Sequence, residues 1–561
     1  MIPAWPSVLM DRFSAFWSWR GSSKNDTTGH ACRTLTMCGQ WLSASCATGA
    51  SARRLLDSNV LTTALWSFSH QMNQPTEQSM LYCLALSRVF SMYASGDSLI
   101  TTKLMRECFH DSRFNSALMV SFDGSGNDGT LAMDFRRDTK KHGSVEHESH
   151  VDAAFAGPVD LNSVGFTLLL GTRVKLEKYA WRMNQQVMIT QSKLGLDSLS
   201  WAGKMMAYAA LGSPSEEVRQ LVRWYYRNSS EDADHVPAQL IRLACDSLEG
   251  QRALAAVAQA EFEEYVLDLI RAILQKVSEL GLPDPDGLVL SGGCALNVLA
   301  NQRVFDEIVE MRPSSKPMGL HITAAPNDSG LSVGGSWAIV PPSSWQPLQY
   351  VGFHLWDFPF LPDHAEKWGA KDLESLGGVE YLAELLSGGP AWIAQRGHNA
   401  AKPIIGVVRD RQEFGPRALG HRSLLAVPDS VEMRERMNRL KFRQWFRPVA
   451  PMIAEEALEE VFGRSVKSPY MTMAPKVRPE VLAKFPALSH LDGTARHQSV
   501  SREDEPWVHA LLLAVGRWTG LAALINTSFN SRGKPIVNRA EDTCDGTRTS
   551  SSCLCIVALL P

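Results

Sequence analysis

The sequence predicts an α/β protein built from two units, and three features of its 561 residues support this. Short apolar runs such as "ALMVSF" and "GLVLS" end in glycine-rich turns, as buried strands do. Residues 252–280 repeat apolar side chains every three or four positions and stop before Gly281 and Pro283, which is typical of a helix. A polar, proline-rich segment at 341–349 separates these elements from later ones. We expect an irregular region over 1–108, an α/β domain over 109–340 and a second α/β domain over 350–561.

Shorter patterns refine this prediction. In the second unit, "GPAWIAQ", "LLAVP", "APMIA" and "LAALINTSF" are strand-like pieces among helices. His142, His147 and His150 follow the first predicted strand, and we interpret their segment as a polar loop.

Composition narrows the class of protein. With 45% hydrophobic residues the chain can bury a sizeable core, and a net charge of −3 gives no overall attraction to nucleic acid or to an acidic membrane. The ten cysteines are scattered without a Cys-x-x-Cys pair, which favours reduced thiols. No apolar run reaches the ~18 residues that a membrane span needs. We expect a cytoplasmic protein with no membrane or nucleic-acid partner, although the Ser-rich, basic first 60 residues leave organellar targeting open.

The motif "LVLSGGCALN" is a candidate phosphate site in the first unit. A strand that turns through glycines into a helix presents backbone N–H groups to an anion. We therefore expect nucleotide contacts at Gly292, Gly293 and Asn297, with Lys204 nearby. The structural alternative is a turn that only makes room for packing.

Two acidic residues in glycine-containing turns are candidate metal ligands. Asp123 ends a predicted strand in "FDGSGNDG", and Asp328 lies in "PNDSG". Carboxylates at strand ends suit a divalent cation, whereas two Asx turns would have the same sequences.

The second unit concentrates positive charge in an acidic protein. Residues 409–447 hold ten Lys or Arg against five Asp or Glu, and glycine and proline lie beside the arginines in "EFGPRALGHRS". Arginine binds phosphate or carboxylate through a fork of N–H groups, while Ser and Asn add directional hydrogen bonds. The alternatives are a nucleic-acid patch or a solvated surface, and the lack of interleaved aromatics argues against single-stranded nucleic acid. The predicted site for a small dianion comprises Arg417, Arg422, Lys441, Arg447, Arg496, Ser528 and Asn530.

Taken together, these motifs resemble the O-carbamoyltransferase family, whose members act on nodulation factors and antibiotics. The matching segments occur in the family's order over about residues 109–543. They read "SALMVSFDGSGNDG", "GKMMAYAALG", "LVLSGGCALNVLAN", "APNDSGLSVGG", "EFGPRALGHRS", "KFRQWFRPVAPMI", "HLDGTARHQSV" and "INTSFNSRGKPIV".

The resemblance implies an actin-like ATPase-type first domain, and a second domain similar to the one that makes the carbamoyl-adenylate in tRNA threonylcarbamoyl synthesis. It implies carbamoyl phosphate and ATP as co-substrates, a divalent metal (iron or magnesium), and transfer of the carbamoyl group to a small-molecule hydroxyl. We also expect a homodimer. The cationic residues above would then hold carbamoyl phosphate.

The chain departs from the family at both ends. The family's His-x-x-x-His metal motif is not found in "DSLITTKLMREC", and the tail after "AED" does not continue the family pattern. We therefore expect weak metal binding and slow transfer, with altered chain ends. Two alternatives stay open: a non-catalytic relative that binds carbamoyl phosphate or nucleotide, and a tRNA threonylcarbamoyl-transferring enzyme.

Overall fold

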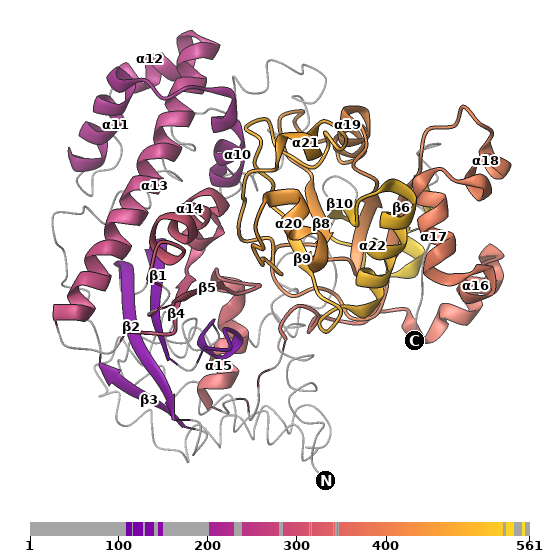
Figure 1. Ribbon diagram of the computed structural model, residues 1–561, viewed down its shortest axis with the longest axis horizontal. Helices are drawn as coiled ribbons and strands as arrows, with labels where there is room; N and C mark the ends of the chain where they lie inside the picture. Colours follow the sequence, from indigo (N-terminus) through magenta and orange to yellow (C-terminus); the bar gives the residue numbers. More distant parts are fainter. Residues whose placement is uncertain are drawn as a thin grey trace, which may run out of the picture.

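The chain forms an α/β structure with two mixed sheets, each covered by helices (Figure 1). The computed structural model describes residues 108–114, 116–126, 129–139, 144–149, 201–228, 238–279, 284–313, 315, 317–339, 342, 345, 347–530, 535–543 and 553–555. The region predicted to be irregular, 1–108, lies outside these residues except for Cys108, and so do His142 and His150.

The first sheet has the strand order β3-β2-β1-β4-β5. β1 runs parallel to β4, and β4 to β5, while β2 and β3 continue the sheet in antiparallel fashion. The strands are β1 Ser116–Gly126, β2 Gly129–Thr139, β3 Ser144–Ser149, β4 Gly287–Ser291 and β5 Gly319–Ile322.

Alternating residues of β1 are buried on both faces of this sheet. Leu118 and Val120 pack with the helical core, whereas Ala117 and Met119 pack on the opposite face with Phe109. A strand covered on both faces needs a continuous apolar run, which is why "ALMVSF" is apolar throughout.

Helices of the first domain gather along one long helix, α13 Leu248–Glu279, which confirms the helix expected over 252–280. Its first half packs with α10 and α11 through Leu254 and Val257, and its second half covers the first sheet through Val266 and Ile270. The other helices are α10 Trp201–Tyr208, α11 Glu216–Asn228, α12 Ala238–Asp246, α14 Val298–Val304 and α15 Leu331–Ile339.

The second sheet has the order β11-β6-β7-β10-β8-β9. Its central strands are antiparallel, and parallel pairs close both edges, β8 with β9 and β6 with β11. The strands are β6 Ile404–Val408, β7 Arg422–Ala426, β8 Ala450–Ala454, β9 Gln498–Val500, β10 Ala523–Ser528 and β11 Cys553–Cys555. The strands predicted from "LLAVP", "APMIA" and "LAALINTSF" are β7, β8 and β10.

Helices cover both faces of the second sheet. α17 and α22 pack on one face against Leu425 and Leu524, and α19 packs on the other against Leu424. The helices are α16 Leu361–Trp368, α17 Gly378–Ser387, α18 Pro390–Arg396, α19 Val431–Leu440, α20 Leu458–Phe462, α21 Pro479–Leu482 and α22 Pro506–Thr519.

Two local predictions are wrong. "GPAWIAQ" forms the helix α18, with Gly389 at its N-cap and Pro390 in its first turn, where proline suits a helix. The segment around His147, expected as a polar loop, forms the edge strand β3 beside β2. In both cases a short run carried too little periodicity to separate the alternatives.

Buried polar groups join the two halves of the chain. The Asn301 side chain is fully buried, and its Nδ2 donates to the carbonyl of Ala295 at 2.7 Å and to that of Thr472 at 2.9 Å. Nearby, the Asp111 carboxylate bridges His321 Nε2 at 2.8 Å and the Tyr470 hydroxyl at 3.0 Å. These bonds satisfy polar groups that would otherwise be costly to bury.

None of the helices in the described residues is both long and apolar enough to cross a membrane.

We predict that Asn301→Ala lowers the free energy of unfolding by about 1–3 kcal/mol, because the carbonyls of Ala295 and Thr472 lose their donor. Urea denaturation followed by circular dichroism measures the change. Asn399→Ala, at an exposed position, is the matched control. Equal stability of the two variants would contradict the bridging role of Asn301.

Candidate functional site

Cationic side chains from three loops of the second domain form a group, which we call the cation cluster. Arg417 lies on the loop between β6 and β7, Lys441 caps the end of α19, and Arg496 precedes β9. Arg443 and Arg447 lie on the segment that leads from α19 to β8. Strands β7, β10, β8 and β9 are successive neighbours in the sheet, so their flanking loops converge.

Mutual repulsion shows that these arginines lie close together. Burial, followed by repulsion from Arg447, lowers the pKa of Arg417 to about 10. Burial and repulsion from Arg447 and Arg417 lower the pKa of Arg443 to about 9. For Arg496, burial and then Arg417, Arg443 and Arg447 lower the pKa well below its usual range. Among the described residues, no carboxylate contributes to the pKa shifts of Arg417, Arg443 and Arg496.

The arginine side chains of the cluster are partly accessible to solvent. Arg417, Arg443 and Arg496 are half-buried, so each keeps some accessible surface although protein surrounds it. Arginine forks that are partly desolvated and reachable are suited to bind an anion with several oxygens.

Lys441 links the cluster to the end of β10. Its Nζ donates to the carbonyls of Ser528 at 2.7 Å and Asn530 at 2.8 Å, and it also contacts Ser528 Oγ and Asn530 Oδ1. Burial, followed by repulsion from Arg443 and Arg447, lowers the pKa of Lys441 to about 7, although the oxygens around Nζ favour the ammonium form. The predicted residues Lys441, Ser528 and Asn530 therefore do meet.

A Schellman motif at the end of α19 sets the direction of Lys441 and Arg443. The N–H of Phe442 donates to the carbonyl of Arg439, and that of Arg443 to the carbonyl of Asn438. Phe442 takes the left-handed conformation, with φ 48°, at the position where glycine is usual. Phe442 is 56% exposed while Lys441 is buried, so the turn separates an outward aromatic from the inward cations.

The residues predicted to bind the dianion do not include Arg443, although its segment "KFRQWFRPVAPMI" is one of the motifs that match the family. An irregular segment has no periodicity from which to predict which side chains face inward. The signal that could have identified it is the Lys-x-Arg spacing directly after a helix.

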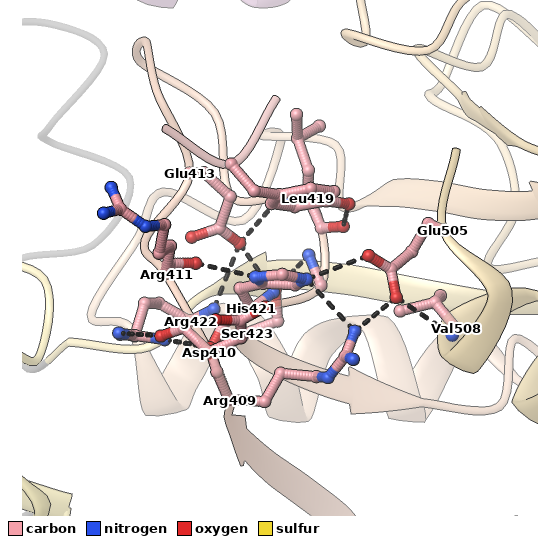
Figure 2. A network of polar contacts seen from close by, with 12 residues as sticks. Arg409, Asp410, Arg411, Glu413, Leu419, His421, Arg422, Ser423, Glu505 and Val508 are labelled. Carbon is pink, nitrogen blue, oxygen red and sulfur yellow. Dashed lines mark hydrogen bonds and ion pairs between the residues drawn. The ribbon is translucent and has the colours of Figure 1, made fainter. Parts of the chain in front are cut away.

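The loop that carries Arg417 folds around a buried carboxylate (Figure 2). Glu413 Oε1 accepts the N–H groups of Leu419 at 2.8 Å, His421 at 2.8 Å and Arg422 at 3.0 Å. Gly420 has φ 116°, which few other residues adopt, and lets the chain turn back toward this carboxylate.

His421 anchors the same loop to α22. Its Nδ1 lies 2.6 Å from the carbonyl oxygen of Arg411, and its Nε2 lies 2.9 Å from Glu505 Oε2 (Figure 2). The Tyr350 ring stacks on the imidazole at 3.6 Å. Burial alone would raise the pKa of Glu505, but His421 and Arg409 hold it below its usual value, so Glu505 is a carboxylate.

Arg422, also a predicted site residue, is held through its guanidinium by backbone carbonyls of its own loop. Its guanidinium is 1% exposed and donates to the carbonyls of Asp410 at 2.8 Å, His421 at 3.0 Å and Arg409. Burial lowers the pKa of Arg422, while Glu413 and Asp410 oppose this effect. Backbone carbonyls accept the hydrogen bonds of the Arg422 guanidinium, so this side chain holds the loop that also carries Arg417.

The predicted glycine turn of the first domain is present. β4 leads through Gly292 into a short 3₁₀ turn and then into α14. Gly292 has φ 87°, its N–H donates to the carbonyl of Pro326 at 2.7 Å, and a Cβ there would lie 2.1 Å from the carbonyl oxygen of Phe122. Close packing against β1 therefore explains the glycine at 292.

The other residues predicted to contact the nucleotide lie in three different elements. Asn297 caps α14 by accepting the N–H of Ala300, and its side-chain amide pairs with Gln259 of α13. Gly293 begins the 3₁₀ turn, and Lys204 is buried in α10.

The predicted metal ligands are Asp123, within β1, and Asp328, which is exposed at the start of a 3₁₀ turn. Within the residues that the structure describes, no group of three or more His, Cys, Asp or Glu side chains could hold a metal ion.

Comparisons with known proteins agree with the sequence motifs. Residues 398–559 match the family model described as Carbamoyltransferase C-terminus. The chain is 30% identical over 383 residues to nodulation protein U of Rhizobium tropici, covering 64% of this chain and 60% of that protein. It is 29% identical over 360 residues to 3'-hydroxymethylcephem-O-carbamoyltransferase of Streptomyces clavuligerus, covering 62% of each. The chain thus spans about 60% of the length of these relatives.

Every residue of the cation cluster lies inside the matched region 398–559. The resemblance to O-carbamoyltransferases is therefore confirmed, and it extends over residues 398–559, which match the carbamoyltransferase C-terminus family model.

Proposed function

We propose that this protein is an O-carbamoyltransferase that binds carbamoyl phosphate at the cation cluster. The observation that carries the proposal is the convergence, within the carbamoyltransferase C-terminal region, of four arginines that repel one another, Arg417, Arg443, Arg447 and Arg496, beside Lys441, whose Nζ donates to the carbonyls of Ser528 at 2.7 Å and Asn530 at 2.8 Å. A bound phosphate dianion would neutralise this repulsion, and its oxygens match the arginine forks.

The carbamoyl group would lie toward Ser528 and Asn530. These residues end β10, and their side chains are 2.8 Å apart, from Ser528 Oγ to Asn530 Oδ1. A hydroxyl and an amide offer both donors and acceptors, as the NH₂ and C=O of a carbamoyl group require. Lys441, bonded to both residues, would join the phosphate subsite to the carbamoyl subsite.

The proposed reaction has two stages. In the second domain, water would first cleave the P–O bond of carbamoyl phosphate to give carbamate and inorganic phosphate. A carbamate oxygen would then attack the α-phosphorus of ATP, forming the carbamoyl-adenylate and releasing pyrophosphate. A hydroxyl oxygen of a small molecule would then attack the carbamoyl carbon, and AMP would leave. Adenylate is a better leaving group than the oxide of free carbamate, and exclusion of water would protect it from hydrolysis.

The first domain completes the proposal as an actin-like transfer domain. Gly293 and Lys204 remain candidates for nucleotide contact, whereas the bonds of Gly292 and Asn297 support packing and capping roles. The divalent metal also remains a proposal, and no step here passes through it. The homodimer also remains a proposal.

We predict that Arg417→Ala and Arg447→Ala each weaken carbamoyl phosphate binding by about 1.5–3 kcal/mol, or roughly 10- to 150-fold, because each removes a charge-assisted contact. Isothermal titration calorimetry measures the change. Arg439→Ala, an exposed cation on α19, is the control for loss of one positive charge. Unchanged affinity in both cluster variants would overturn the site.

We predict that carbamoyl phosphate binding takes up a proton near pH 7. The pKa of Lys441 is about 7 in the free protein, and a bound dianion raises it toward the ordinary value. Affinity should therefore fall as the pH rises through about 7, with uptake of ~0.5 proton at pH 7.

The uptake is measured from the dependence of the calorimetric enthalpy on the ionisation enthalpy of the buffer. It should vanish in Lys441→Met and persist in Lys467→Met, an exposed lysine. The same buffer dependence in wild type and Lys441→Met would show that another group titrates.

We predict that pyrophosphate release from ATP requires carbamoyl phosphate and falls at least about 10-fold in Arg447→Ala. A coupled pyrophosphate assay measures the first stage. Mass spectrometry of a hydroxyl acceptor, with a 3'-hydroxymethylcephem as one probe, measures the second. If neither wild-type reaction depends on carbamoyl phosphate, the proposed function is wrong.

A further inference from the structure

The backbone on both sides of Arg417 is held by side chains from distant elements. Asn526 Nδ2 donates to the carbonyl of Ala418 at 2.8 Å, and Tyr350 Oη donates to that of Leu419 at 2.9 Å. These bonds come from β10 and from the segment that precedes the second sheet's first strand. They fix single carbonyls, as does Gln498 Nε2, which donates to the carbonyl of Leu419 at 3.1 Å, and Ser423 Oγ accepts the N–H of Gly420 at 3.0 Å. The N–H groups of residues 419, 421 and 422, which set the path of the loop toward its inner side, are left to another group.

Glu413 supplies the contacts that define this path. Its Oε1 accepts hydrogen bonds from the N–H groups of residues 419, 421 and 422, on the inner side of the loop (Figure 2). The side chain is 5% exposed, so these bonds form in a site of low polarity, where a carboxylate acceptor is strong.

This arrangement opposes the repulsion that acts on Arg417. An arginine beside Arg447 and Arg496 would move away if its loop were free, because separation of like charges lowers the energy. The Glu413 carboxylate keeps the loop closed while the anion site is empty, so Arg417 is already oriented when an anion arrives.

We propose that Glu413 is a positioning residue for the anion site: it folds the 413–422 loop so that Arg417 faces the other cations. The identity of the anion rests on the proposed function, whereas the fold of the loop does not. Glu413 itself acts through Arg417 and touches no substrate.

The first test measures the loop directly by hydrogen exchange with mass spectrometry. In Glu413→Gln, which keeps a neutral oxygen, the amides of residues 419–422 should exchange at least about 10-fold faster than in wild type. In Glu413→Ala they should exchange faster still. Glu366→Gln, an exposed glutamate on α16, is the control for the charge change and should match wild type. Unchanged exchange in Glu413→Gln would overturn the proposal without any ligand.

The second test is a double-mutant cycle on binding of carbamoyl phosphate, with inorganic phosphate as a second probe. Glu413→Gln should weaken binding about 10-fold in the wild-type background and less than about 2-fold in Arg417→Ala. Glu413→Ala should have a larger effect than Glu413→Gln, which keeps an acceptor. Equal weakening in both backgrounds would overturn the proposal, because Glu413 would then act on the fold in general.

The two tests separate this inference from the proposed function. If wild type binds inorganic phosphate but not carbamoyl phosphate, the proposed substrate is wrong, and the cycle with phosphate still decides the role of Glu413. If wild type binds neither probe, the cation cluster is not an anion site. The positioning proposal is then wrong too, even if hydrogen exchange in Glu413→Gln is faster.

Discussion

The repulsion among the half-buried arginines of the cation cluster is the constraint that shapes the second domain. Arg447 disfavours the charge of Arg417, Arg443 and Arg496, so the backbone of each loop must hold its arginine in place. The glutamate-centred loop, the Schellman motif after α19 and the bonds of Lys441 to the end of β10 supply that support. The rigidity of these loops is thus a requirement of the charge that they carry.

Much of this domain can be predicted from sequence because its signals are local. "APMIA" and "LAALINTSF" are short apolar runs among turn residues, a pattern that favours buried strands, and they form β8 and β10. Arg417, Lys441, Arg447 and Arg496 were predicted from residue type and from neighbouring glycine and proline. The periodicity of α13 predicted its existence, although the helix begins four residues earlier than expected, at Leu248.

The remaining features depend on tertiary contacts that leave little trace in the sequence. Arg417 and Arg422 look equivalent in "GPRALGHR", yet only the fold shows that backbone carbonyls occupy the fork of Arg422. The end of α19 cannot be predicted from the sequence, because Phe442 occupies the left-handed position after the helix where glycine is usual. Gly292 resembles a phosphate-binding glycine, but the nearby carbonyl of Phe122 accounts for it.

The length of α13 has a mechanical consequence for the whole protein. Its 32 residues extend for about 48 Å. One end shares a core with Phe446, which stands beside Arg447 on the cationic segment, and the other end covers the first sheet. A continuous helix resists bending, so it acts as a rod between the two regions. The separation of the first sheet from the cation cluster is therefore set by the length of this helix, which packs against both regions.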